Sequence, residues 1–133
     1  MKRLTILWQR VTVDGGTCER CGDTGGNVRQ AVETLRRELS ALDIEVVLTE
    51  KALPPFAPGA VAESNRVFFN GRAVEDLLGA KVGLNRCRSC CEMLGKAADA
   101  KVDCRTLTLD GRVHEALPLE LLLRAGRLAA NGL

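Results

Sequence analysis

Two strand-like runs flank an amphipathic helix in the first fifty residues, and this arrangement most limits how the chain can fold. The run from Leu4 to Val13 is rich in β-branched and aliphatic residues, with apolar side chains on both faces, as a central strand requires. A helix is predicted over Asn27 to Asp43, and Ile44 to Leu48 is predicted as the second strand. The apolar stripe of the helix consists of Val28, Val32, Leu35, Leu39 and Leu42. A strand–helix–strand crossover in one sheet is right-handed and gives parallel strands, so a β-α-β unit is expected here.

The middle of the chain alternates between breaker-rich and strand-like segments. Lys51 to Ser64 contains three prolines and is predicted to be a loop. Arg66 to Phe69 is predicted as a third strand, followed by a turn at Asn70-Gly71. Ala73 to Gly79 has apolar residues at helical spacing and predicts one or two helical turns.

The last thirty residues predict a hairpin and a terminal helix. Arg105 to Leu109 and Arg112 to Ala116 both alternate, and Asp110-Gly111 between them is a turn signal. Pro118 suits the first turn of a helix whose buried face would include Leu119, Leu122, Leu123 and Ala125.

Together these elements predict an α/β chain with a mixed sheet in the β-α-β-β-α order of the thioredoxin fold. The first hairpin strand is taken as the fourth strand of the sheet, and its partner adds one more strand. A cysteine-bearing insertion, about residues 72–103, would then lie between strands three and four. With 133 residues the chain is expected to form one domain, residues 1–133.

Composition and charge exclude several classes of function. A net charge of +2 and an aromatic content of 3% give a nucleic-acid partner little to bind. The N-terminal apolar run is interrupted by Gln9 and Arg10 and is too short for a signal peptide or a membrane span. We therefore expect a cytoplasmic protein without a membrane or nucleic-acid partner. Six cysteines in a reducing compartment favour metal or redox chemistry over a disulfide framework.

The Cys-x-x-Cys motif at Cys18 and Cys21 is the candidate active site. Such a motif beside a β-α-β pattern is typical of thiol–disulfide redox proteins, because a helix N-terminus stabilises a thiolate. Half of a zinc site and an inert pair of thiols are the alternatives. Asp23 or Thr24 could cap the helix, and the glycines of 22–26 would hold Cys18 away from its first turn. Arg20 favours a thiolate on its neighbour and Glu19 opposes it, so the sequence does not fix the pKa of either thiol.

A second group of cysteines is the candidate metal site, and its members are Cys87, Cys90, Cys91 and Cys104. Four thiolates can hold zinc or another soft cation in a tetrahedral site. Cys90 and Cys91 are adjacent, and neighbouring side chains diverge, so they suit a single tetrahedral site less well. A site of three cysteines with one outside ligand, or a site shared with Cys18 and Cys21, is therefore also considered. A second dithiol that relays electrons and a set of buried thiols are the remaining alternatives.

Other polar residues carry weaker signals. His114 is the only histidine and is expected to be exposed on the hairpin. Glu75 and Asp76 are expected to be surface charges of the short helix rather than catalytic carboxylates. The glycine-rich segments lack the spacing and the lysine of a phosphate-binding loop.

The chain resembles an uncharacterised group of small bacterial and archaeal thioredoxin-like proteins, catalogued as a domain of unknown function. The resemblance is carried by Cys18-Glu19-Arg20-Cys21-Gly22, by 65–72, by 74–79, by Cys87-x-x-Cys90-Cys91 and by Cys104-Arg105-Thr106 with its hairpin and Ala116-Leu117-Pro118. It implies a thioredoxin-like fold and no established substrate. Thioredoxins place a cis-proline where this chain has Ser64-Asn65-Arg66, so an ordinary trans peptide is expected there. In the relatives this proline helps to keep metals off the dithiol, so its absence makes metal capture at Cys18 and Cys21 more credible.

The resulting functional hypothesis is thiol–disulfide exchange with protein thiols or disulfides as partners. Cys18 would be the nucleophile and Cys21 the resolving thiol, while the second cluster would bind structural zinc or relay electrons. The competing hypothesis is a non-enzymatic protein that binds zinc or a soft metal ion through the same thiols. A third is an interaction module in which the cysteines only stabilise the fold.

Overall fold

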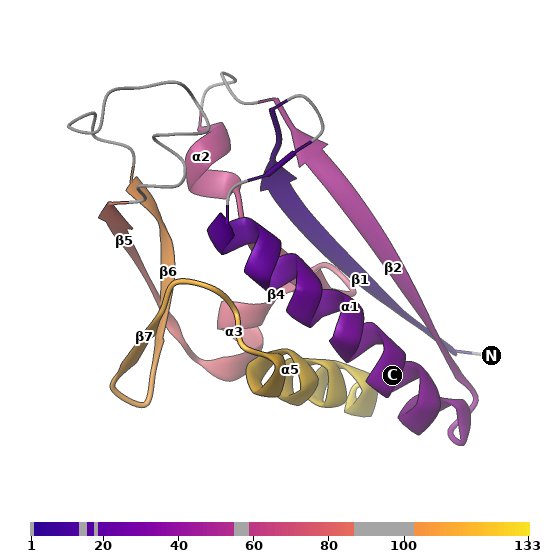
Figure 1. Cartoon of the computed structure of the whole chain (residues 1–133). Coiled ribbons are helices and arrows are strands. Elements are labelled where there is room, and N and C mark those ends of the chain that lie inside the picture. The colour runs from indigo at the N-terminus through magenta and orange to yellow at the C-terminus, as the bar shows by residue number, and fades with distance from the viewer. Residues whose placement is uncertain (1, 14–15, 18, 55–58, 87–102) are drawn as a thin grey trace.

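A mixed four-stranded sheet and a smaller antiparallel sheet, with their helices, make up the described part of the chain (Figure 1). The computed structural model describes residues 2–13, 16–17, 19–54, 59–86 and 103–133. The chain therefore has the mixed α/β architecture that the sequence predicts.

The larger sheet has the strand order β2-β1-β3-β4. Its strands are β1 (Lys2–Val11), β2 (Ile44–Leu53), β3 (Arg66–Phe69) and β4 (Arg72–Ala73). β2 runs parallel to β1, with Leu4 opposite Val46, while β3 is antiparallel to β1 and β4 to β3. The predicted parallel pair and the central position of the first strand are both confirmed. β2 extends past its predicted end at Leu48 into the expected loop.

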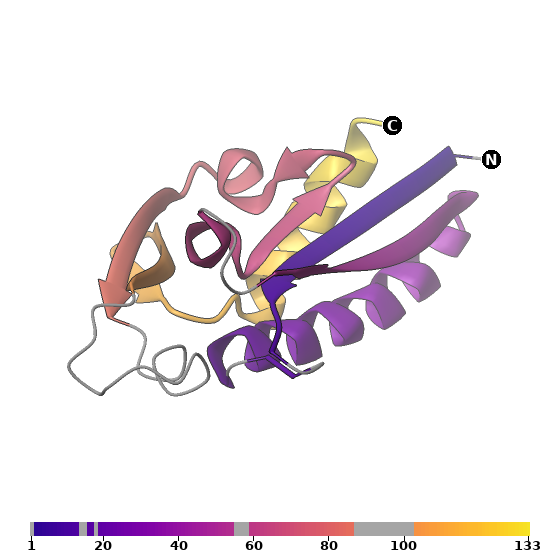
Figure 2. The same cartoon turned by 90° about the horizontal axis from the view of Figure 1, so that it is seen from above.

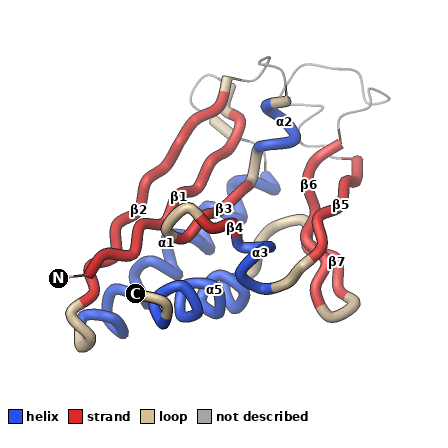
Figure 3. The backbone as a smooth tube through the Cα atoms, turned by 180° about the vertical axis from the view of Figure 1, so that it is seen from behind, coloured by secondary structure: helices blue, strands red, loops and turns tan. Residues whose placement is uncertain are grey.

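Two long helices, α1 (Glu19–Ser40) and α5 (Leu119–Asn131), lie side by side on one face of this sheet (Figure 3). The short helix α2 (Ala60–Glu63) packs against β1, and α3 (Val74–Leu78) packs against β3, β4 and α5. The view from above shows α5 crossing beneath the strands beside α1 (Figure 2). None of the described helices is long and apolar enough to cross a membrane.

The core lies between these two helices and the sheet. The predicted stripe of α1 is buried, with Val28, Val32, Leu35 and Leu39 each at most 5% exposed. Leu4, Ile6 and Trp8 of β1 belong to the same buried cluster. Burial of one such side chain stabilises the fold by about 1.5–3 kcal/mol. The expectation that Leu42 extends the stripe is wrong, because α1 ends at Ser40 and Leu42 is 64% exposed.

The smaller sheet contains the predicted hairpin and has the order β5-β6-β7. Its strands are β5 (Lys81–Arg86), β6 (Asp103–Leu109) and β7 (Arg112–His114). The turn between β6 and β7 has positive φ at both central residues, 52° at Asp110 and 77° at Gly111, as the tight turn of a twisted hairpin requires.

The expectation that β6 is the fourth strand of the main sheet is wrong. The Asn70-Gly71 turn returns the chain at once as β4, whose Ala73 pairs with Phe68 of β3. The main sheet is thereby complete before the cysteine-bearing segment begins. The expected insertion of residues 72–103 therefore begins with a strand of the main sheet, and Cys87, Cys90 and Cys91 fall between β5 and β6 in the sequence rather than between strands three and four. The hairpin belongs to the separate antiparallel sheet.

The predicted terminal helix begins at Leu119, with Pro118 as its N-cap rather than in its first turn, and ends at Asn131. Its buried residues are Leu121, Leu122, Ala125, Gly126, Ala129 and Ala130. Leu119 and Leu123 were expected on this face and are only half-buried.

Candidate functional site

Cys21 lies in the first turn of α1 and is 2% exposed. Its Sγ is 3.2 Å from the Oγ of Ser64, in a buried contact between α1 and the residue that follows α2. Ser64 Oγ also accepts a hydrogen bond of 2.8 Å from the backbone N–H of Val11, at the end of β1. The second thiol of the motif is therefore buried at the junction of β1, α1 and the approach to β3. Cys18 lies outside the described residues.

The expected separation between the motif and its helix is wrong, because α1 begins at Glu19, the residue after Cys18. The glycines at 22, 25 and 26 and the expected caps Asp23 and Thr24 are all inside the helix. Thr24 is fully buried, and its Oγ1 accepts a hydrogen bond of 3.0 Å from the N–H of Leu117. The helix thus presents the positive end of its dipole at the Cys-x-x-Cys motif, which favours a thiolate there.

Gly25 allows this extension of the helix. A Cβ at Gly25 would lie 2.3–2.8 Å from three ring carbons of Trp8, closer than packed atoms approach. The indole ring of Trp8 therefore occupies the space that a side chain at position 25 would need. This contact packs the first turns of α1 against β1.

Arg20 connects the motif to the smaller sheet. Although charged, it is only 8% exposed. Its guanidinium donates to Asn85 Oδ1 at 2.8 Å and to Glu115 Oε2 at 2.9 Å, and Asn85 Nδ2 donates to Glu115 Oε1 at 3.2 Å. These hydrogen bonds satisfy the buried cation and attach the residue between the two cysteines to β5 and to the segment after β7.

The Ser64–Asn65 step, where a thioredoxin would carry its cis-proline, has an ordinary trans peptide as expected, and none of the described peptide bonds is cis. Asn65 has a φ of 65°, a left-handed conformation that asparagine tolerates. Its N–H donates to the carbonyl of Gln9 at 2.8 Å and its Nδ2 donates to the carbonyl of Glu115 at 3.1 Å. The backbone next to Ser64 is thus held by hydrogen bonds to β1 and to the segment after β7.

One carboxylate beside this step has a shifted pKa. The hydrogen bond from Arg66 holds the pKa of Glu63 below its ordinary value, against the opposing effect of partial desolvation. Glu63 also receives a hydrogen bond from Gln9 Nε2. It is therefore an ionised group at neutral pH, paired with Arg66.

Of the second cysteine cluster, the structure describes Cys104 alone, whereas Cys87, Cys90 and Cys91 lie outside the described residues. Cys104 is 3% exposed and lies opposite Asn85 in the ladder between β5 and β6. Asn85 is also the hydrogen-bond partner of Arg20, so this residue of β5 is next to Cys104 in the sheet and bonded to the residue that precedes Cys21. Among the described residues no three histidine, cysteine, aspartate or glutamate side chains form a group that could hold a metal ion.

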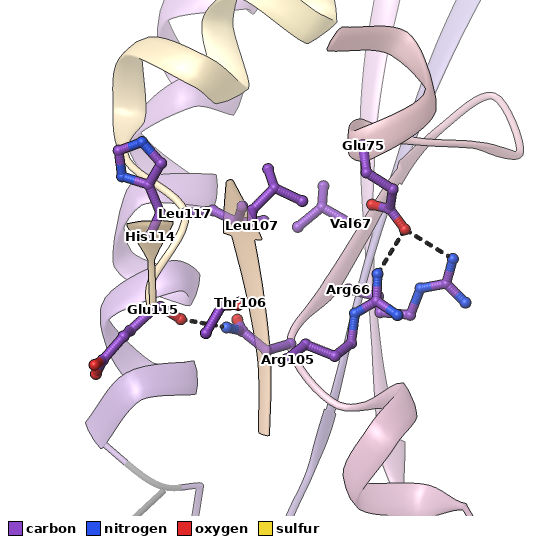
Figure 4. A pocket seen from close by; sticks show the side chains of 10 residues that line it. Arg66, Val67, Glu75, Arg105, Thr106, Leu107, His114, Glu115 and Leu117 are labelled. Carbon is purple, nitrogen blue, oxygen red and sulfur yellow. Dashed lines mark hydrogen bonds and ion pairs between the residues drawn. The ribbon is translucent and has the colours of Figure 1, made fainter. Parts of the chain in front are cut away.

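The expectation that Glu75 is a surface charge is wrong, whereas Asp76 is exposed as expected. Glu75 is 9% exposed, and its Oε1 accepts hydrogen bonds from Arg66 at 3.1 Å and Arg105 at 2.6 Å (Figure 4). The carboxylate joins α3 to β3 and β6, so its role is to hold the two sheets together. The signal that sequence reasoning missed was an arginine on each of the two strands.

His114 is half-buried rather than exposed, and it lines a cavity of about 10 Å³ between the two sheets (Figure 4). This volume holds about one water molecule. Asn65, which also lines the cavity, has a buried Oδ1 with no hydrogen-bond partner among the described residues. A single water would satisfy that oxygen, and the space is too small for an organic substrate.

The cysteine pair could be predicted from the sequence, whereas its contacts could not. Ser64 and Glu115 were not predicted to support the motif, and Arg20 was predicted only to favour a thiolate on its neighbour. Two features of the sequence pointed to these contacts. Arg20 lies inside the motif and needs a counter-charge if it is buried. Ser64 belongs to the segment that stands in place of the thioredoxin cis-proline.

Comparisons with known proteins agree with one another. A family model described as a domain of unknown function, DUF2703, matches residues 4–126. An uncharacterized protein of Archaeoglobus fulgidus is 39% identical over 122 residues, which cover 90% of this chain and 82% of the relative. No solved structure matches.

Proposed function

The chain belongs to the family described as domain of unknown function DUF2703, and we propose from its own residues that it is a thiol–disulfide exchange protein. Cys18 is the attacking thiol and Cys21 the resolving thiol in this proposal. The observation that carries it is the burial of Cys21, 2% exposed, in the first turn of a helix that begins directly after Cys18. The proposal includes a reducing, cytoplasmic setting, in which such a dithiol can be regenerated.

A thioredoxin-like fold forms part of the proposal, and the strand arrangement supports it. The parallel unit β1-α1-β2 is followed by an antiparallel pair, β3 and β4, in one sheet, and α5 returns to the face covered by α1. In such a fold the first cysteine is exposed and the second lies deeper. The smaller sheet and its cysteine-bearing segment are then an insertion between β4 and the final helix.

The proposed exchange is balanced in atoms and electrons. The Cys18 thiolate attacks one sulfur of a substrate disulfide, forms a mixed disulfide and releases one substrate thiol. The Cys21 thiolate then attacks the Cys18 sulfur, which forms the Cys18–Cys21 disulfide and releases the second substrate thiol. Two protons and two electrons pass from the dithiol to the substrate disulfide, and a cellular dithiol of the same chemical class reverses the change.

The position of Arg20 gives this proposal a direct test. Trypsin cuts after Arg10, Arg20 and Arg29, so Cys18 and Cys21 fall in the separate peptides 11–20 and 21–29. After oxidation in a dithiol buffer, a digest made without reduction should contain these two peptides joined by a disulfide. Cys18→Ser should abolish the joined pair, and Cys104→Ser should leave it intact. If wild-type protein yields no joined pair at any buffered potential, the redox proposal is wrong.

A metal-binding function is the second candidate, and the position of Cys104 favours it. Cys104 lies opposite Asn85, which is bonded to the motif residue Arg20, so its strand reaches the neighbourhood of the first motif. Buried thiolates suit zinc or another soft cation. Elemental analysis of protein purified without oxygen tests this candidate. About one equivalent of metal lost in Cys87→Ser and retained in Cys18→Ser assigns the metal to the second cluster. Loss in Cys18→Ser instead favours a metal carrier, and no change in metal or thiol chemistry in Cys18→Ser favours an interaction module.

A further inference from the structure

The hydroxyl of Ser64 occupies a defined place between the backbone of β1 and the sulfur of Cys21. Its Oγ is 2.8 Å from the N–H of Val11 and 3.2 Å from Cys21 Sγ. Ser64 and Cys21 are each 2% exposed. Bulk water is therefore excluded from the contact, and the protein itself must stabilise any charge that forms on the sulfur.

The chemistry of the two groups fixes the direction of the hydrogen bond once the sulfur is ionised. A hydroxyl has one proton to donate and two lone pairs that accept. The N–H of Val11 occupies one lone pair of Ser64, which leaves the proton for another partner. A thiolate has no proton, so the Ser64 O–H must be the donor to the Cys21 sulfur. Hydrogen bonds to an ionised group are about twice as strong as neutral ones.

Two charged side chains on the neighbouring elements have other partners. Arg20, in the same turn of α1, donates to Asn85 and Glu115. Glu63, the last residue of α2, accepts a hydrogen bond from Arg66. Among the described residues, Ser64 brings a hydroxyl within hydrogen-bond distance of this sulfur.

We propose that Ser64 donates a hydrogen bond to the Cys21 thiolate and stabilises it during disulfide exchange. The inference rests on the proposed function for its role in turnover, because Cys21 is the attacking group in the resolving step and the leaving group in its reverse. A stabilised thiolate is a better leaving group, so Ser64 speeds the reductive opening of the Cys18–Cys21 disulfide. No further oxidant or reductant is needed beyond the substrate disulfide and the cellular dithiol already named.

The test compares the buried hydroxyls of Ser64 and Thr24. Ser64 and Thr24 each accept a backbone N–H, but only the hydroxyl of Ser64 contacts the sulfur. Ser64→Ala and Thr24→Val each remove a hydroxyl with little change in shape. Ionisation of Cys21 is followed by NMR of its Cβ in protein labelled at cysteine, with Cys21→Ser used to assign the signal.

Ser64→Ala should raise the pH of half-ionisation of Cys21 by about one unit or more, a tenfold change in the ionisation constant. Thr24→Val should leave this value unchanged, and Ser64→Thr, which keeps the hydroxyl, should restore it. Ser64→Gly provides a second variant without the hydroxyl in case the alanine variant does not fold. Equal ionisation of Cys21 in wild-type protein and in a folded hydroxyl-free variant overturns the inference.

The same set of proteins separates this inference from the proposed function. Reductive opening of the disulfide by a small dithiol should be slower in Ser64→Ala than in Thr24→Val. If wild-type protein forms no Cys18–Cys21 disulfide and Cys21 ionisation still depends on Ser64, the exchange function fails and the hydrogen bond stands. If the disulfide forms and Ser64→Ala changes neither ionisation nor opening, the inference fails and the exchange function stands.

Discussion

Two consecutive glycines in α1 should respond in opposite directions to the same substitution. A Cβ at Gly25 would lie 2.3, 2.7 and 2.8 Å from three carbons of the Trp8 ring, whereas a Cβ at Gly26 meets nothing within 4 Å. The indole cannot easily move aside, because it is rigid and is covered by the guanidinium groups of Arg10 and Arg29, 4.5 and 5.6 Å from its centre. Overlap at position 25 must therefore displace the start of α1.

The expected magnitudes follow from two opposing terms. Alanine is favoured over glycine in a helix by about 1 kcal/mol. Overpacking a buried site costs about 1–3 kcal/mol, and the shortest of these contacts places Gly25 in the upper part of that range. Gly25→Ala should therefore lower the free energy of unfolding by about 1–2 kcal/mol, while Gly26→Ala should raise it by up to about 1 kcal/mol.

Urea unfolding followed by circular dichroism measures both changes. Trp8 is the only tryptophan, so its fluorescence reports the contact itself in the same samples. Gly25→Ala should also alter native-state emission, and Gly26→Ala should leave it as in the wild type. Equal stabilisation by both substitutions would refute the proposed close contact between α1 and the Trp8 ring.

Two further predictions concern ion pairs. Glu75→Gln should lower the free energy of unfolding by roughly 2–4 kcal/mol, because two partly buried guanidinium groups lose their shared carboxylate, while Asp76→Asn on the exposed side of α3 should be nearly neutral in the same urea assay. The hydrogen bond from Arg127 lowers the pKa of Glu38, so this pair contributes stability above the ordinary glutamate pKa of 4.5, and the contribution is lost as pH falls through the lower folded value. Arg127→Gln should flatten this acid dependence of the unfolding midpoint, and an unchanged acid profile would contradict the assignment.

The sequence predicted elements with long, regular patterns and missed those that depend on contacts far along the chain. The stripe from Val28 to Leu39 located the body of α1, but its first turns contain three glycines, each disfavoured in a helix by about 1 kcal/mol. Packing against Trp8 and the hydrogen bond between Thr24 and Leu117 provide the stabilisation that local propensity lacks. β4 has only two residues, too few to show a strand periodicity in the sequence. The first strand of the β6–β7 hairpin was therefore predicted to be the fourth strand of the main sheet.

The residues of the candidate site also differ in whether the sequence predicts them. Cys21 was predicted because its spacing from Cys18 is a motif within four consecutive residues. Ser64 and Glu115 were not, because they approach the motif only through the packing of α1 against β1 and the smaller sheet. Glu75 was assigned to the surface because nothing local shows that a charge will be buried between partners from two other strands.

The central position of β1 has a consequence for the order in which the chain folds. Its pairing partners begin at Ile44 and end at Phe69, tens of residues further along the chain, so neither pairing is local. Long loops must close before such contacts form, whereas α1 and the β6–β7 hairpin need only near neighbours. We therefore expect α1 to form before the sheet closes around β1. Cys21 would then belong to a helix before it meets Ser64, and the thiol reaches its final surroundings only when β1 and β3 come together.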